Sequence, residues 1–95
     1  MILIFGGTTE GRTAAETLDE AGQPFYYSTR GTLQEVTCRN MTRLTGNMDS
    51  EKIISFCREH DIRLIIDAAH PFAQQLHLNI FLAAKELTIK VVRLE

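Results

Sequence analysis

Five short runs of apolar or β-branched residues divide the chain, and helix-like patterns lie between most of them. The first run is continuous and apolar from Ile2 to Phe5, as in a parallel strand that is covered on both faces. The run that includes Leu64, Ile65 and Ile66 is the next clearest. Strands are therefore predicted at residues 1–5, 25–29, 42–45, 62–67 and 90–94.

Three intervening segments carry apolar residues at the spacing of one helical face. Gly22 follows the first segment, where glycine typically ends a helix. Pro71 is expected at the first position of the third helix, where its missing N–H costs nothing. The predicted helices run from Thr9 or Glu10 to about Ala21, from a cap at Asp49 or Ser50 to His60–Asp61, and from Pro71 to about Leu87.

Strands that alternate with helices, without a hairpin signal, predict right-handed βαβ units and a parallel sheet. We expect one doubly wound α/β domain over residues 1–95, with five strands in the order 3-2-1-4-5. Residues 31–41 are ambiguous: they fit either a short helix around Leu33–Val36 or a surface loop.

Composition excludes several classes of function. The chain has 95 residues and a formal net charge of -2, which provides no basic field for nucleic acid. No apolar run approaches the roughly 20 residues of a membrane span, and the first residues lack the features of a signal peptide. A cytoplasmic protein is expected, with Cys38 and Cys57 reduced and Cys57 packed in the core.

Small, polar and glycine residues follow four of the predicted strands. In a doubly wound sheet, ligands bind outside the carboxyl ends of the strands, where the strand order reverses between strands one and four. The opposite ends of the strands carry no comparable residues. The convergence predicts a ligand site at this edge, built from Gly6–Arg12, Ser28–Arg30, Gly46–Met48 and Ala68–Phe72.

The first of these turns fits a phosphate group. Gly6 and Gly11 occupy the outer positions of a G-x-G-x-x-G pattern, although Thr8 stands at the middle one. Backbone N–H groups, the hydroxyls of Thr8 and Thr9, and a helix N-terminus suit an anion. The alternative is that the glycines only allow a tight connection from strand to helix.

The end of the second strand favours NADP over NAD. An acidic residue there would bind the ribose 2′-hydroxyl of NAD, but the sequence has Ser28, Thr29 and Arg30. Two hydroxyls and a guanidinium suit a 2′-phosphate, and Arg12 could add a second positive charge. Arg30 as a solvated loop residue is the alternative.

The turn after strand four offers close backbone approach and a histidine. Ala68 and Ala69 are small, and His70 is expected to be neutral because a helix N-terminus would disfavour its charged form. Asp67 is an alternative cap for this turn, and His77 shares a helical face with His70. Further metal ligands are not evident, so no metal site is predicted.

These segments resemble the precorrin-6A reductases, including the cobalt-precorrin-6A form. The resemblance spans the whole chain, with Ala69 where the family more usually has Thr. It is carried by Gly6-Gly-Thr-Thr-Glu-Gly-Arg12, Ser28-Thr29, Gly46, Asp67-Ala-Ala-His-Pro-Phe-Ala73 and Val92-Arg-Leu-Glu95.

The resemblance implies a Rossmann-like lobe that binds NADPH for hydride transfer to a tetrapyrrole in cobalamin biosynthesis. The family has two lobes, and residues 1–95 match only the N-terminal one, so this chain is expected to be an excised domain or a truncated product and to be inactive alone. The phosphates would contact Gly6, Gly7, Thr8, Thr9, Gly11 and Arg12, and the 2′-phosphate would contact Ser28, Thr29 and Arg30. Gly46, Asn47 and Met48 would line the adenine side, and Ala69, His70 and Pro71 would face the nicotinamide or the tetrapyrrole. His70 is the candidate for positioning the substrate.

Two alternatives remain at the level of the sequence. One is the cofactor domain of an unrelated NADP-dependent reductase or epimerase; the Tyr-x-x-x-Lys pair of such enzymes is absent here, but it would normally lie beyond residue 95. The other is a non-enzymatic nucleotide-sensing domain that regulates a partner. A second α/β lobe in the full-length gene would favour the reductase.

Overall fold

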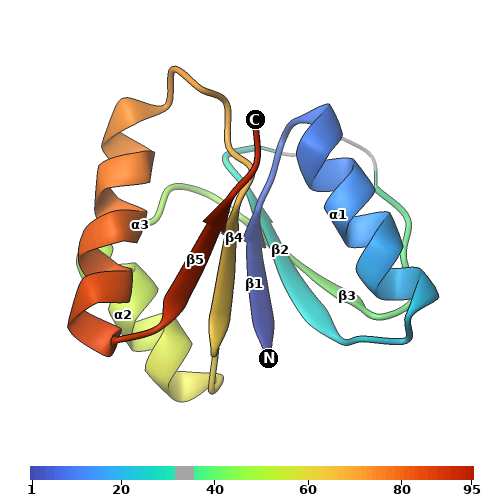
Figure 1. Cartoon of the computed structure of the whole chain (residues 1–95), viewed down its shortest axis with the longest axis horizontal. Coiled ribbons are helices and arrows are strands. Elements are labelled where there is room, and N and C mark those ends of the chain that lie inside the picture. The colour runs from blue at the N-terminus through green and yellow to red at the C-terminus, as the bar shows by residue number, and fades with distance from the viewer. Residues whose placement is uncertain (32–35) are drawn as a thin grey trace.

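A five-stranded parallel sheet runs through the middle of the molecule (Figure 1). The computed structural model describes residues 1–31 and 36–95. The strand order is β3-β2-β1-β4-β5, so the predicted class, direction and order are confirmed. The strands are β1 (Ile2–Phe5), β2 (Phe25–Thr29), β3 (Met41–Thr45), β4 (Leu64–Asp67) and β5 (Lys90–Arg93).

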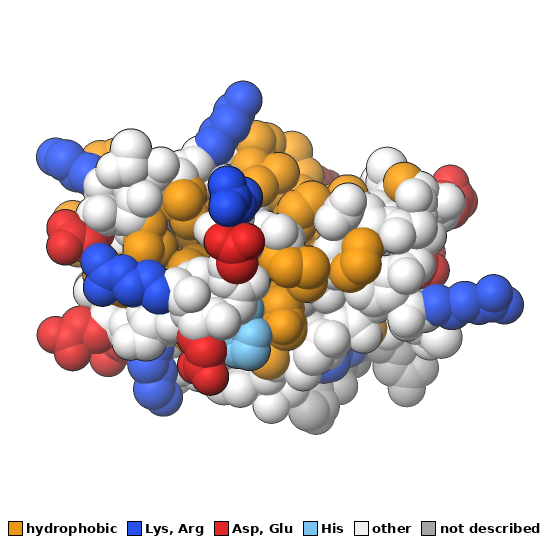
Figure 2. Space-filling model, turned by 90° about the horizontal axis from the view of Figure 1, so that it is seen from below, with side chains coloured by type: hydrophobic (Ala, Val, Ile, Leu, Met, Phe, Trp, Pro, Cys, Tyr) orange, Lys and Arg blue, Asp and Glu red, His pale blue; other side chains and the backbone are white. Residues whose placement is uncertain are grey.

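Helices cover both faces of this sheet. The helix α1 (Thr9–Glu20) lies on one face, and α2 (Ser50–Glu59) and α3 (Gln74–Leu87) lie together on the other (Figure 1). The carboxyl ends of the strands point to one edge. Figure 2 looks at the opposite edge, where the strands begin, and hydrophobic side chains gather there with charged side chains around them.

The central strand β1 is buried because its side chains alternate between two cores. Leu3 and Phe5 pack on the side of α2 and α3, whereas Ile4 packs on the side of α1. Cys57 belongs to the first core, as predicted, and burial raises the pKa of its thiol to about 11. The prediction that the apolar run at the N-terminus forms a strand covered on both faces is therefore confirmed.

The start of α3 differs from the expectation. Pro71 is not at the first helical position: the helix begins three residues later, at Gln74. Residues 70–73 form a turn in which the N–H of Ala73 donates to the carbonyl of His70 at 2.9 Å. His70 is therefore not adjacent to the helix N-terminus, so the helix dipole is not the reason for a neutral ring.

Four strand boundaries also shift, the first being the start of β1, at Ile2 instead of residue 1. β4 begins at Leu64 instead of residue 62, because the N–H of Ile62 closes the end of α2 by donating to the carbonyl of Cys57. β3 begins one residue earlier than expected, at Met41, and β5 ends one residue earlier, at Arg93. The short helix considered around Leu33–Val36 lies largely on residues 32–35, outside the described ranges.

The predicted signals at the start of α2 and the end of α1 are confirmed. Asp49, one of the two candidate caps of α2, accepts the N–H of Lys52 at 2.8 Å. Gly22 follows α1 with a φ of 70°, a conformation that glycine adopts without strain.

Candidate functional site

A cleft of about 1000 Å³ opens at the carboxyl ends of the strands. It lies where the order reverses, since β1 has β2 on one side and β4 on the other. All four predicted segments contribute to its wall. The predicted residues that line the cleft are Gly6, Gly7, Ser28, Thr29, Arg30, Gly46, Asn47, Met48, Ala69 and His70.

Five predicted residues do not line this cleft: Thr8, Thr9, Gly11, Arg12 and Pro71. Contact of these five residues with a cofactor therefore stays a prediction. Glu10 also lies elsewhere, because it borders a shallow groove between α1 and the end of β5.

The first turn is shaped by two glycines with different roles. Gly7 has a φ of 102°, and a Cβ there would meet no atom within 4 Å. A Cβ at Gly6 would lie 2.2 Å from the ring of Tyr27. Gly7 therefore permits the backbone conformation, and Gly6 permits the close approach of the turn to β2.

Tyr27 lies beneath this turn, and the sequence reading did not single it out. Its ring is fully buried and its hydroxyl accepts the N–H of Gly7 at 3.2 Å. Burial raises the pKa of the phenol, while the bond from Gly7 and the charges of Arg43 and Arg12 oppose that shift. The aromatic Phe-Tyr-Tyr run indicated a strand, but not that one hydroxyl supports the turn.

Gly11 is a packing residue. It is buried, and a Cβ there would lie 2.9 Å from the Cα of Gly6 and 3.0 Å from the hydroxyl of Tyr27. Its N–H donates to the hydroxyl of Thr8 at 3.1 Å. The third glycine of the pattern therefore lets α1 approach the sheet closely, as the third glycine does in dinucleotide-binding turns.

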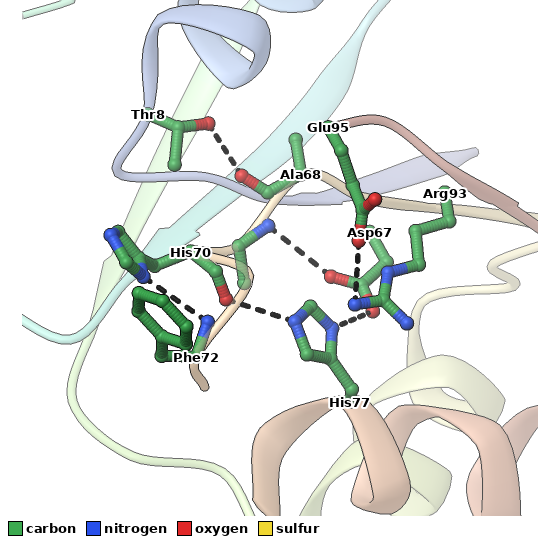
Figure 3. Close-up of polar contacts among 9 residues, drawn as sticks. Thr8, Asp67, Ala68, His70, Phe72, His77, Arg93 and Glu95 are labelled. Atoms are coloured by element: carbon green, nitrogen blue, oxygen red, sulfur yellow. Dashed lines mark hydrogen bonds and ion pairs between the residues drawn. The ribbon is translucent and has the colours of Figure 1, made fainter. Parts of the chain in front are cut away.

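Thr8 joins two of the turns around the cleft. Its side chain caps α1 by accepting the Gly11 N–H, and its hydroxyl donates to the carbonyl of Ala68 (Figure 3). A glycine at this position would provide neither bond. The departure from the usual glycine pattern thus connects the turn after β1 to the turn after β4.

Replacing Thr8 by Ala should lower the free energy of unfolding by about 1–2 kcal/mol, because one helix cap and one cross-turn hydrogen bond are lost. Thr8→Ser keeps the hydroxyl and should retain most of the stability. Urea denaturation of the two variants beside the unmodified chain measures this difference. Equal losses in both variants would contradict the assigned role.

The hydroxyls at the end of β2 are buried and already engaged. The hydroxyl of Thr29 donates to the carbonyl of Gly31 and accepts from Nη2 of Arg43 at 3.2 Å. Ser28 Oγ lies 3.9 Å from the sulfur of Met48. Arg43, which pairs with Tyr27 in register and lies over its ring at 5.7 Å, was not singled out from the sequence.

Arg30 brings a positive charge to the rim of the cleft. Its Nε donates to Oδ1 of Asn47 at 3.1 Å, which joins the loop after β2 to the loop after β3. Gly46 has a φ of 105°, so the second loop turns sharply directly after β3. The guanidinium is exposed and oriented by one neutral partner.

In the turn after β4, the ring of His70 accepts a backbone hydrogen bond. The N–H of Phe72 donates to Nδ1 of His70 at 3.2 Å, and a backbone N–H can only donate. Nδ1 must therefore be unprotonated, which leaves the proton on Nε2. A neutral His70 stays a prediction, and this local bond replaces the helix dipole as its physical basis.

Asp67 caps the same turn, one of the roles considered for it. Its Oδ1 accepts the N–H of Ala69 at 3.2 Å, and its Oδ2 lies 2.6 Å from Nδ1 of His77. Nε2 of His77 lies 2.9 Å from the carbonyl of His70 (Figure 3). His77 and His70 are thus neighbours, although only His77 belongs to a helix.

The cleft has lining residues beyond the predicted set. Phe72, the last residue of the predicted segment Ala68–Phe72, is 82% exposed, and its ring lies 5.2 Å from the ring of His70. The sequence did not single out Gln75, Leu76 and Asn79 of α3, which also line the cleft. The additional lining residues include Phe5, Asp49, Phe72, Ala73, Gln75, Leu76 and Asn79.

No helix within residues 1–31 and 36–95 is long and apolar enough to cross a membrane. In those same ranges, no group of three or more His, Cys, Asp and Glu side chains is placed to hold a metal ion.

The sheet order and the position of the cleft define a Rossmann-like α/β domain. Solved structures agree. The leucoanthocyanidin reductase–NADPH complex from Vitis vinifera matches with a TM-score of 0.76 at 17% identity, over 94% of this chain and 33% of that one, which shows the fold alone.

The family follows from the sequence comparisons. The model of the precorrin-6x reductases, CbiJ/CobK, matches residues 1–95, and the chain belongs to this family of oxidoreductases of cobalamin biosynthesis. A cobalt-precorrin-6A reductase of Priestia megaterium is 31% identical over 97 residues, which are 100% of this chain and 38% of that protein. A precorrin-6A reductase of a Sinorhizobium species is 33% identical over 98% of this chain and 36% of its own length.

A solved structure supports the same assignment. The CobK precorrin-6A reductase matches with a TM-score of 0.88 and 25% identity, over 99% of this chain and 38% of that one. The chain therefore spans less than two fifths of the length of the relatives that it matches.

Proposed function

We propose that this chain is the NADPH-binding N-terminal lobe of a cytoplasmic reductase that acts on precorrin-6A or cobalt-precorrin-6A. The observation that carries the proposal is the convergence of four separate loops on one cleft at the point where the strand order reverses. The family match over the whole chain favours this reading over a nucleotide sensor or an unrelated reductase.

The residues of the first turn fit a dinucleotide. Gly6 and Gly7 line the cleft without side chains, and the space around a Cβ at Gly7 is open. Backbone can therefore approach an anion closely at this position, beside the N-terminus of α1. We assign the pyrophosphate to this turn, with Thr9 and Arg12 at its margin.

The rim between the loops after β2 and β3 suits the 2′-phosphate. Arg30 and Asn47 form one polar unit there, and no carboxylate stands at the end of β2. A guanidinium can bind a phosphate through two parallel hydrogen bonds, whereas it gains little from a ribose hydroxyl. Ser28 and Thr29 shape this part of the wall, and Gly46 and Met48 border the adenine side.

At the other end of the cleft, the chain's own residues would orient the reactants. His70 presents its Nε2–H as a donor, and the exposed ring of Phe72 offers an apolar surface for a flat ring system. Bound NADPH would supply the hydride, as nicotinamide cofactors do. Ala69 and Pro71 lie beside His70 and would face the nicotinamide or the tetrapyrrole.

Binding of the two nicotinamide cofactors tests the proposal. Calorimetric titration of the 95-residue chain should show weak binding of NADPH and still weaker binding of NADH. We expect no reduction of a tetrapyrrole by this chain alone, because the family's second lobe would complete the substrate site. Equal affinity for both cofactors, or a preference for NADH, would refute the assignment of the 2′-phosphate site.

A further inference from the structure

A buried acid–histidine pair lies directly behind the wall of the cleft. Asp67 ends β4 with 4% of its side chain exposed, and His77 projects from α3 with 10% exposed. Their Oδ2 and Nδ1 atoms are 2.6 Å apart. Neither side chain lines the cleft, so the pair has no direct part in binding as proposed above.

One polar atom of each residue in this pair reaches the segment that carries His70. Oδ1 of Asp67 accepts the N–H of Ala69, and Nε2 of His77 lies 2.9 Å from the carbonyl of His70. Nε2 of His77 donates to this carbonyl, because a carbonyl oxygen can only accept, and Nδ1 faces the carboxylate of Asp67. The pair therefore bonds to the backbone at both Ala69 and His70.

Other bonds hold mainly the two ends of this segment. Ala68 donates its N–H to the carbonyl of Phe5 and accepts the hydroxyl of Thr8, and the carbonyl of Ala73 accepts the N–H of His77. α3 begins at Gln74 with Ala73 at the cap position, and Ala73 provides no side-chain bond to the helix. Between the two ends, the further backbone bonds found among the described residues run from the N–H of Ala73 to His70 and from the N–H of Gln74 to Phe72. The histidine ring rests on one of the same residues, through the N–H of Phe72.

We propose that Asp67 and His77 are positioning residues that hold residues 68–73 against α3 and thereby fix His70 as the Nε2–H tautomer facing the cleft. His77 binds the carbonyl of His70, and the His70 ring accepts the N–H two residues later, so one anchor orients the whole turn. Any effect of this positioning on cofactor or substrate binding rests on the proposed function. The effect on the tautomer of His70 is independent of that function.

Nitrogen NMR of the histidine rings in the unliganded chain tests this inference at neutral pH. In the unmodified chain, His70 should show the signature of a single Nε2–H tautomer. In His77→Ala the ring should become a mixture of tautomers, and hydrogen exchange of the Phe72 and Ala73 amides should accelerate at least tenfold.

Two further variants separate positioning from general stability. Asp67→Asn can still accept from Ala69 and can donate to a neutral His77, so the tautomer of His70 should be retained. Ile80→Val removes a core methylene from α3 without touching the pair, and His70 should again be unchanged. If His70 lost its single Nε2–H tautomer in Ile80→Val, general packing of α3 and not the Asp67–His77 pair would determine the tautomer, and the inference would be overturned.

If His77→Ala does not fold, His77→Gln replaces it, since the amide can serve one of the two acceptors. A smaller shift in the same direction is then expected. An unchanged His70 signature in the folded His77 variant would overturn the inference, whatever the affinity for NADPH. Absence of NADPH binding by the unmodified chain would instead refute the proposed function and leave the positioning role standing.

Discussion

Gly6→Ala is expected to lower the free energy of unfolding by about 3 kcal/mol, the upper end of the usual cost of overpacking. The added Cβ would lie 2.2 Å from both Cζ and the hydroxyl oxygen of Tyr27, whose side chain is fully buried and whose hydroxyl is bonded to the next residue of the turn. The ring cannot move without breaking its bond to Gly7. Urea denaturation followed by circular dichroism measures the change.

Gly31→Ala is the matched control for this substitution. Gly31 also lines the cleft, but a Cβ there would meet no atom of the described residues within 4 Å. Its stability should remain within about 0.5 kcal/mol of the unmodified chain. A Gly6→Ala variant as stable as the Gly31→Ala variant would show that the turn does not rest on Tyr27 as described.

Arg30→Ala is expected to weaken NADPH binding by roughly 10- to 150-fold and to leave NADH binding nearly unchanged. The range corresponds to the 1.5–3 kcal/mol of a hydrogen bond to a charged group. NADH lacks the 2′-phosphate that the guanidinium would bind, so it loses little. Calorimetric titration of both cofactors at one fixed salt concentration gives the two ratios.

Arg58→Ala provides the control for net charge. Arg58 is exposed in the last turn of α2 and does not line the cleft. Its replacement by Ala therefore removes the same charge at a different place. NADPH affinity should stay within about twofold in this variant, as expected of a distant screened charge. If Arg30→Ala weakens both cofactors equally, Arg30 does not select between them.

The sheet was predictable because its signals are local. The apolar run of β1, the helix signals at Gly22 and Asp49, and the regular alternation of strands and helices leave few possible topologies. Once the order is known, the edge that carries the loops follows without knowledge of any contact. This is why ten of the predicted residues meet in one cleft.

The connections between loops were not predictable in the same way. Thr8 binds the carbonyl of Ala68, sixty residues away, and the hydroxyl of Tyr27 supports a turn twenty residues earlier. Such bonds depend on the register of neighbouring strands, which no local pattern specifies. Thr8 at a glycine position therefore looked like an imperfect motif, although it connects two walls of the site.

The predicted start of α3, at Pro71, was wrong for a physical reason. Proline fits the first turn of a helix, but it also fits a tight turn, and the sequence does not distinguish the two. In the structure Pro71 belongs to the turn, and the bonds from His77 and Asp67 set its shape. Their partner atoms are backbone groups, which leave no trace in a pattern of side chains.

The most direct test of the central claim is a map of amide chemical shifts during titration of the chain with NADPH. The account predicts that signals of Gly7, Arg30, Asn47 and His70 move together, since they share the cleft at the carboxyl ends of the strands. Signals of Thr17 and Leu94, in the groove between α1 and β5, should stay in place. Shifts confined to that groove would contradict the proposed cofactor site.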